Sequence, residues 1–511
     1  MTDLCGLPDE LLLAVAKCLR DDTEDGYSDL NHLALSCRKL RPIAQEVFYT
    51  DISITPTLER GLALLARTLL QRLDLATRVR KLDVKLSYEQ FTHSESCVSE
   101  GYYYEDSEEE CTCGIPDLGT HFMGFLIGVK SKDGVPLRNK GWEDMLMRGE
   151  DTALVGLILC VTSALSDLTL MIWNSPRCNP NGNNDVAWTE FEEVFEFKEV
   201  FEGITRQKNL ADCFQGLSRL KRLFTDDYPP CSWLSLPQLE AARIKLFEGA
   251  YYDGTMISQI THDATVSTTL TSLVIQTEFE ALYSHDAIHM DGMYGHIRSV
   301  VRGLTNLTHL FILYRTVLDS HDDFDPRNTP RGSFAHIVAH LESRSLTNLT
   351  LDVEPTLKDL VRYMIMLEYT RGVSPMTWLA GLPKFRNLNA PQEAFFSANE
   401  EFRTCHLPTT IESISIMDAK YETKRYLKHL LDRQTEWPNL KTIKIGESPC
   451  NDQSVYPAES DDDASESDAG ERRKVSEVDD SIYEQARSRG LRAEKVQDRT
   501  AWKKGWEGLG L

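Results

Sequence analysis

The sequence lacks any long apolar run. No stretch of its 511 residues approaches the roughly 18 consecutive apolar residues of a membrane-spanning helix. The N-terminus also lacks a basic region followed by an apolar stretch, which is the pattern of a secretory signal. We therefore expect a cytoplasmic or nuclear protein that has no membrane partner. The hydrophobic content of 41% still indicates a globular protein with a sizeable core.

Positive charge is in short supply, with 55 Lys and Arg against 79 Asp and Glu and a net charge of −24. This balance argues against nucleic acid as the main partner, because phosphate backbones are bound by basic surfaces. The 12 cysteines lack a disulfide-like arrangement and are scattered mostly singly among apolar residues, as at Cys160 and Cys213. Such cysteines are typical of buried thiols in a reducing compartment.

The motifs of common catalytic sites are missing as well. The chain has no Gly-x-Gly-x-x-Gly after a strand, no phosphate-binding Gly-Lys-Ser/Thr loop, no His-Glu-x-x-His and no Gly-x-Ser-x-Gly. Cys97, Cys111 and Cys113 with His93 do not have the paired spacing of a structural zinc site. We therefore predict a protein that is not an enzyme and that binds no cofactor or metal.

Three short amphipathic helices are expected between residues 4 and 54. Pro8 suits a first helical position, where its missing N–H is not needed. A second helix is predicted after Ser28 and a third from Pro42. The first helix carries four apolar residues that are expected to form one stripe, Leu11, Leu12, Val15 and Leu19. Because so small a bundle leaves much apolar surface wet, we expect Leu7, Leu12 and Leu19 to face a partner.

The run Leu7-Pro8-Asp9-Glu10-Leu11, with the later Leu30, Leu33, Cys37, Arg38 and Lys39, resembles the F-box. The resemblance is confined to residues 4–54. It implies a domain that docks on the Skp adaptor and, through it, on a cullin–RING ubiquitin ligase. The adaptor-binding residues that it implies are Leu7, Pro8, Leu11, Leu12, Val15, Leu19, Leu30 and Leu33. The alternative is an ordinary helical cap on a larger domain.

A pattern with apolar residues at positions one, four and six recurs along the rest of the chain. It begins at Val79, Leu165, Leu239, Leu270, Leu307, Leu346, Ile411 and Leu440, with weaker copies from Leu217 and Phe385. The last apolar residues of seven copies, at 244, 275, 312, 351, 390, 416 and 445, lie 26 to 39 residues apart. Intervals of this size indicate stacked strand-and-helix repeats, because one such unit cannot cover its own apolar face.

These repeats resemble irregular leucine-rich repeats, although the Asn usual three places after the last Leu is replaced by Glu278, Arg315 and Glu354. The predicted fold class is α/β, with an N-terminal three-helix F-box, an irregular leucine-rich-repeat-like solenoid and a disordered acidic tail. The alternative is a compact α/β domain whose strands share a pattern.

In a solenoid, strand residues between the buried ones point to the concave face of the sheet, because strand side chains alternate. The residues expected there are Thr169, Arg243, Val274, Phe311, Thr350, Ser415 and Lys444. Phe311 and the nearby Leu313 are apolar, and exposed apolar groups in a concavity indicate a bound partner. This row is the predicted target-binding surface. The alternative is that a loop or the tail covers Phe311 and Leu313.

The composition changes after Gly446. Residues 458–480 are strongly acidic and nearly free of apolar side chains, so they are expected to be disordered. The predicted domains are the F-box at 4–54, the solenoid at 55–447 with an insertion at about 93–150, an acidic linker at 448–480 and a helical, basic segment at 481–511.

The sequence thus predicts a non-catalytic substrate receptor that bridges an unidentified target protein to a Skp–cullin–F-box ubiquitin ligase. A ligase-independent scaffold, in which the helical cap is only structural, is the second hypothesis.

Overall fold

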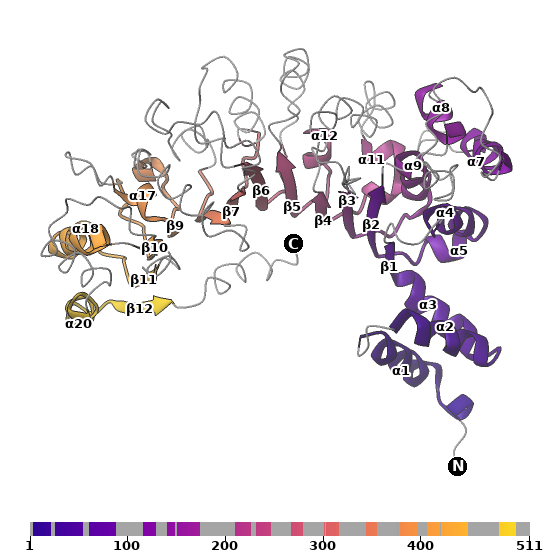
Figure 1. Ribbon diagram of the computed structural model, residues 1–511, viewed down its shortest axis with the longest axis horizontal. Helices are drawn as coiled ribbons and strands as arrows, with labels where there is room; N and C mark the ends of the chain where they lie inside the picture. Colours follow the sequence, from indigo (N-terminus) through magenta and orange to yellow (C-terminus); the bar gives the residue numbers. More distant parts are fainter. Residues whose placement is uncertain are drawn as a thin grey trace, which may run out of the picture. The chain divides into compact units, whose positions relative to one another are not determined.

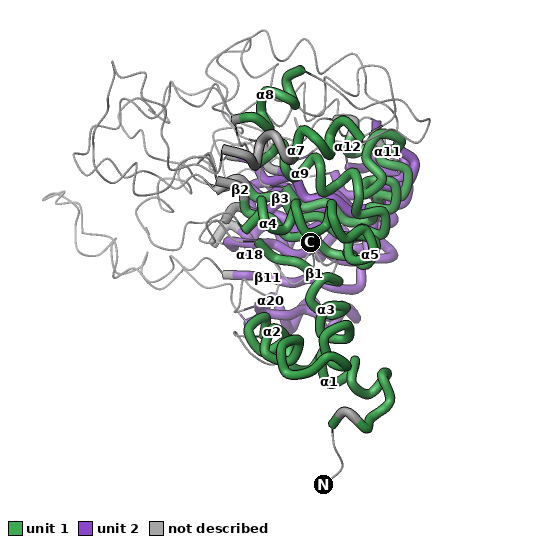
Figure 2. Tube along the Cα trace, turned by 90° about the vertical axis from the view of Figure 1, so that its right-hand side faces the viewer, with its two compact units in different colours: residues 1–239 green, residues 240–511 purple. Residues whose placement is uncertain are grey.

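The structure is a computed structural model that divides the chain into two compact units, residues 1–239 and 240–511 (Figure 2). The residues that it describes are 4–21, 26–54, 61–87, 116–128, 140–148, 151–173, 210–225, 231–246, 267–278, 301, 303–315, 344–354, 376, 379–396, 406–419, 421–447 and 480–496. Both units are mixed α/β, and within each unit the described strands run parallel to the strands with which they pair (Figure 1).

Unit 1 begins with a short 3-10 turn, Leu4–Gly6, and three helices, α1 (Asp9–Asp21), α2 (Gly26–Ser36) and α3 (Leu40–Thr50). The three predicted helices are therefore present. Two of their starting points were predicted too late, since α2 begins at Gly26 rather than after Ser28, and α3 begins at Leu40 rather than Pro42. Gly26 makes the tight entry to α2 possible, because a Cβ at this position would clash with the backbone oxygen of Arg20.

The rest of unit 1 holds four parallel strands in chain order, which are β1 (Asp51–Ile54), β2 (Lys81–Ser87), β3 (Asp167–Trp173) and β4 (Arg222–Thr225). The described helices and turns between them are α4 (Gly61–Gln71), α5 (Leu73–Ala76), α7 (Pro116–Gly128), α8 (Lys140–Arg148), α9 (Asp151–Val161), α11 (Leu210–Cys213) and η4 (Gln215–Leu217), and α12 (Cys231–Leu234) follows β4. Helix α9 is buried nearly throughout and packs against α4, α5, α8 and β2.

Unit 2 continues the same arrangement with eight strands. They are β5 (Ala241–Leu246), β6 (Ser272–Glu278), β7 (His309–Arg315), β8 (Asn348–Glu354), β9 (Asn387–Pro391), β10 (Ser413–Ala419), β11 (Thr442–Glu447) and β12 (Arg492–Val496). Its described helices and turns are η7 (Leu379–Gly381), α17 (Gln392–Phe395), α18 (Tyr421–Asp432), η8 (Gln434–Glu436) and α20 (Asp480–Ser488).

Every full copy of the sequence pattern coincides with a strand, and its residues at positions one, four and six are buried on one face, here called the core face. The register pairs position four with position four in successive copies, as in Leu273, Leu310 and Leu349. One weak copy was misplaced. The register aligns Leu168 with Leu223, so the copy begins at Leu220 rather than Leu217.

Successive copies share a backbone acceptor at position two. The carbonyl of Thr271 accepts the N–H groups of both Thr308 and His309, at 2.8 and 3.0 Å. The carbonyl of Thr308 accepts those of Thr347 and Asn348 in the same way. Threonine hydroxyls at position two reinforce the link, since Thr308 donates to Thr271 and Thr347 to Thr308, each at 2.9 Å. These threonine hydroxyls thus link neighbouring copies in a chain that lacks the asparagine usual in leucine-rich repeats.

The C-terminal segment differs from the expectation of a helical, basic tail. Helix α20 is present, but β12 follows it and pairs with β11. The sequence pattern hides this strand, because the residues aligned with positions four and six of β11 are Ala493 and Lys495. Arg489 binds the carbonyl of Leu431 and Asp432 on α18. The segment is thus the last strand-bearing copy of unit 2.

Several expectations concern residues outside the described ranges. They are the acidic linker apart from Asp480, the cysteines and histidine weighed as a zinc site, His93, Cys97, Cys111 and Cys113, and residues 497–511 of the C-terminal segment. Part of the expected insertion is described, and it contains helices α7 and α8.

Truncation after residue 479 is expected to lower the melting temperature of the protein and to promote aggregation. It removes α20 and β12, and so exposes the edge of β11 and the apolar side of α18. Differential scanning calorimetry and light scattering measure the two effects. Truncation after Val496 is the control and keeps both elements; equal losses in the two proteins would contradict the assigned role of β12.

Candidate protein-interaction surfaces

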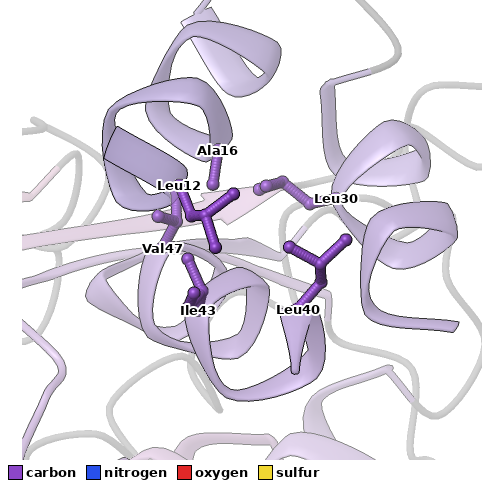
Figure 3. Packing of buried hydrophobic residues seen from close by; sticks show 6 residues of the cluster. All are labelled: Leu12, Ala16, Leu30, Leu40, Ile43 and Val47. Atoms are coloured by element: carbon purple, nitrogen blue, oxygen red, sulfur yellow. The ribbon is translucent and has the colours of Figure 1, made fainter. Parts of the chain in front are cut away.

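The three N-terminal helices enclose a small core of their own (Figure 3). Its buried members are Leu12, Ala16, Leu30, Leu40, Ile43 and Val47, which converge between α1, α2 and α3. Leu12 is only 1% exposed, and so is Leu30. The expectation that Leu12 and Leu30 contact a partner is therefore wrong for this structure. Consecutive helical residues point about 100° apart, and in α1 this rotation turns Leu12 into the core and Leu11 outward.

A different face of α1 is left open. Leu11 is 52% exposed and Val15 is 37% exposed, and Pro8 just before the helix is exposed as well. These three residues, here called the α1 stripe, follow the three- and four-residue spacing of one helix face. Leu7, Leu19 and Leu33 are partly buried, and Leu7 and Leu33 pack against the bundle core. Of the eight implied adaptor-binding residues, the structure thus leaves Pro8, Leu11 and Val15 on the surface.

The bundle is joined to the first strand by polar contacts. Arg20 forms an ion pair with Asp51 at 2.6 Å, and its guanidinium lies over the ring of Tyr27 at 5.6 Å from the centroid. The Tyr27 hydroxyl donates to the carbonyl of Asp51 at 3.1 Å. Burial raises the pKa of Tyr27 from an ordinary value that already keeps the hydroxyl protonated at neutral pH, so the hydroxyl acts as a donor. These contacts fix α1 and α2 against the start of β1.

The residues predicted for the concave surface do lie on one face, here called the second face, opposite the core face. In unit 2 the register aligns Arg243, Val274, Phe311 and Thr350 at position five, and Asn389 continues the row to Ser415 and Lys444. Thr169 holds the same position in unit 1, where it is partly exposed.

The second face of unit 2 is largely covered, which corrects the expectation of an exposed apolar pair. Val274 is 0% exposed, Phe311 6% and Leu313 4%, and the three form a cluster separate from the core face. Thr350 and Ser415 are also buried, whereas Arg243 and Lys444 are partly exposed. Strand alternation placed these side chains on the correct face, but it carries no information about what covers that face.

The second face of unit 1 is more accessible. Its position-five row contains Ser53, Asp83, Thr169 and Phe224, which are aligned by the parallel register and are all partly exposed. Sequence reasoning missed Asp83 and Phe224. Asp83 is the position-five residue of the first copy, so the pattern contained its signal; Phe224 was hidden by the misplaced copy at Leu217.

Asp83 is poorly stabilised as an anion. Burial is the main cause that raises the pKa of its carboxyl; Lys85, Lys81 and a hydrogen bond with Ser53 act in the opposite direction, and Asp51 adds to the rise. Its Oδ1 atom is buried and has no hydrogen-bond partner among the described residues. A half-buried carboxylate with one unpartnered oxygen weakens the folded state when it is ionised.

Two other features, a metal site and a membrane-spanning helix, are not found among the described residues. No group of three or more His, Cys, Asp or Glu residues there has an arrangement suited to a metal ion. The described helices are all too short or too polar to cross a membrane. In comparisons with known proteins, no protein-family model and no curated protein matches this chain.

Replacing Leu12 by Ala is expected to reduce the free energy of unfolding by about 2–5 kcal/mol, because it leaves a cavity in the three-helix core. Leu11→Ala is the matched control on the next residue and should change this free energy by less than about 0.5 kcal/mol. Urea unfolding followed by circular dichroism gives both values. Similar losses for the two variants would contradict the described orientation of α1.

Asp83→Asn is expected to raise the melting temperature at pH 7. An acid with a raised folded-state pKa contributes stability below its unfolded value of about 3.8, and this contribution is lost as the pH rises through the folded-state pKa. The amide avoids burying a charge, so the gain should be present at pH 7 and should vanish near pH 3. Calorimetry at the two pH values checks the sign; a lower melting temperature at pH 7 would contradict the assignment.

Proposed function

We propose that this chain is a non-catalytic substrate receptor that docks through its N-terminal helices on the Skp adaptor of a cullin–RING ubiquitin ligase. The observation that carries the proposal is the α1 stripe. The bundle fills its own core with Leu12, Leu30 and their neighbours, yet Leu11 and Val15 remain exposed on the helix that carries the F-box-like sequence. Exposed apolar residues at helical spacing suit a helical partner with a complementary groove.

The proposed mechanism needs no catalytic group from this chain. A receptor that binds an adaptor with one surface and a target with another raises the effective concentration of the target beside the ligase. The helices would provide the first surface. The partly exposed second face of unit 1 would provide the other. We propose that the strand-bearing part is an irregular leucine-rich-repeat-like solenoid. The recurring register and the shared position-two carbonyls support the repeat interpretation.

A ligase-independent scaffold is the second candidate. The observation in its favour is the set of contacts between the bundle and β1, in which Arg20 and Tyr27 both bind Asp51. These contacts suit a structural cap on the first strand. The two roles are compatible, because the α1 stripe and the contacts with Asp51 involve different residues.

The double variant Leu11→Asp with Val15→Asp is expected to abolish binding to a purified Skp adaptor while leaving the melting temperature nearly unchanged. Both side chains lie on the surface, so the charges oppose docking without entering the core. Biolayer interferometry measures the binding. Leu7 is avoided because it packs against the bundle core, so its replacement would combine a loss of stability with a loss of contact.

Leu64→Asp on α4 is the matched control, since Leu64 is 48% exposed and lies outside the bundle. It should bind the adaptor as the unmodified protein does. Retained adaptor binding in the double variant, or no binding in the unmodified protein, would overturn the receptor proposal and favour the scaffold.

A further inference from the structure

The N-terminal bundle passes into the strands of unit 1 without a linker. Helix α3 ends at Thr50 and β1 begins at Asp51, so no residue lies between the two elements. The same short strand carries Ser53, which is the first residue of the position-five row on the second face. The bundle that bears the α1 stripe and the accessible second face are therefore joined by regular structure rather than by a loop.

Each of the three helices makes its own polar contact at this junction. Helix α1 contributes Arg20, whose Nη2 lies 2.6 Å from the carboxylate of Asp51 and 3.1 Å from its carbonyl oxygen. Helix α2 contributes Tyr27, which donates to the same carbonyl at 3.1 Å. Helix α3 contributes Glu46, which accepts from Arg78 at 2.6 Å just before β2. These five residues are here called the joint.

The joint resists both screening and rotation. The side chains of Arg20 and Asp51 are only 17% and 29% exposed, so salt screens their ion pair less than it screens a fully exposed one. The backbone N–H of Arg80 donates to the carbonyl of Thr50 at 2.8 Å, which ties the last turn of α3 to β2. A body that is attached at several separate points cannot turn about any one of them. The bundle is thus held in one orientation on β1 and β2.

Orientation matters for a receptor that must bring two other molecules together. The gain in effective concentration is greatest when a connection holds both surfaces at a matching distance, and it falls when a flexible connection lets them sample many distances. In ubiquitin transfer a lysine Nζ attacks the thioester that carries ubiquitin. An isopeptide bond forms, the C–S bond breaks and the lysine proton passes to the released thiol. A fixed receptor would present the same lysines to this thioester at each encounter.

We propose that the joint fixes the α1 stripe relative to the second face of unit 1 and so selects which lysines receive ubiquitin. Arg20, Tyr27, Glu46, Asp51 and Arg78 are then positioning residues, which touch neither the thioester nor the lysine. The inference rests on the receptor function proposed above and adds to it a geometric role for contacts that would otherwise serve only to cap β1.

The first test measures the orientation in the full chain. Fluorophores are attached through unnatural residues at the exposed positions His32 on α2 and Asp144 on α8, and single-molecule energy transfer gives the distance distribution. The unmodified joint should give one narrow peak. Arg20→Ala combined with Glu46→Ala, and separately a Gly-Ser-Gly insertion between Thr50 and Asp51, should each broaden the peak about twofold or more.

The matched control removes two ion pairs outside the joint. Arg72→Ala combined with Arg433→Ala breaks the pairs with Asp74 at 2.8 Å and with Glu436 at 2.6 Å. This variant should keep the narrow peak. An unchanged peak in both joint variants would overturn the proposal, and equal broadening in the control would do so as well.

The second test measures lysine selection in a reconstituted Skp–cullin–RING ligase in which the chain modifies itself. Mass spectrometry compares three exposed lysines of unit 1, which are Lys81, Lys140 and Lys221. In the unmodified protein the most and least modified of these should differ about tenfold or more, and in the joint variants they should differ less than about threefold. Adaptor binding should change less than twofold, because the joint lies outside the α1 stripe. An identical lysine pattern in the joint variants would refute the positioning role.

The two tests separate this inference from the receptor function. If the adaptor binds and the joint variants keep both the narrow peak and the lysine pattern, the positioning role is wrong and the receptor function stands. If the unmodified protein does not bind the adaptor, the receptor function falls and the lysine selection falls with it. Broadening of the peak together with a more even lysine pattern and retained adaptor binding would support both.

Discussion

The repeated strand-to-strand link at position two is the interaction on which the rest of this protein depends. One carbonyl, such as that of Thr271, accepts two N–H groups from the next copy, and a threonine hydroxyl adds a third donor. This link fixes the register at the start of most of the described strands. A fixed register brings positions one, four and six together on the core face, where apolar burial supplies the stability. The hydrogen bonds at position two set the register, but they add little net free energy by themselves. Apolar burial on the core face supplies the stability, and it requires that register.

The same register creates the surfaces on the opposite face. Side chains at position five line up across strands whether or not they are needed for the core. In unit 2 the row contains Val274 and Phe311, and it is buried. In unit 1 the corresponding row contains Asp83 and Phe224 and is partly open. The same strand arrangement thus gives a second face that is buried in unit 2 and partly exposed in unit 1. The side chains at position five decide what each of these faces can contact.

The N-terminal bundle follows a different principle. Its core is complete, since Leu12, Leu30, Ile43 and Val47 fill the space between three helices. Its contacts with the first strand include the polar groups of Arg20, Tyr27 and Asp51. A bundle that is satisfied internally and is joined to the next element by polar bonds has no intramolecular use for Leu11 and Val15. That surplus of apolar surface is what makes a docking role reasonable, independently of the resemblance to the F-box.

The sequence by itself determined the local periodicities. It placed the strands that carry full copies of the pattern, the three helices of the bundle and the position-five row of unit 2, because burial of a repeated unit imposes a spacing that a single chain already contains. It failed where spacing is ambiguous or absent. The adjacent Leu11 and Leu12 left the inward face of α1 undecided. Leu217 and Leu220 lie three residues apart, so the start of the β4 copy was ambiguous. In β12, Ala493 and Lys495 stand where the pattern has larger apolar residues. Only the tertiary structure decided which side chains stay exposed: Phe311 is buried and Phe224 is partly exposed although both hold position five, because burial depends on packing in three dimensions and a local period carries no such information.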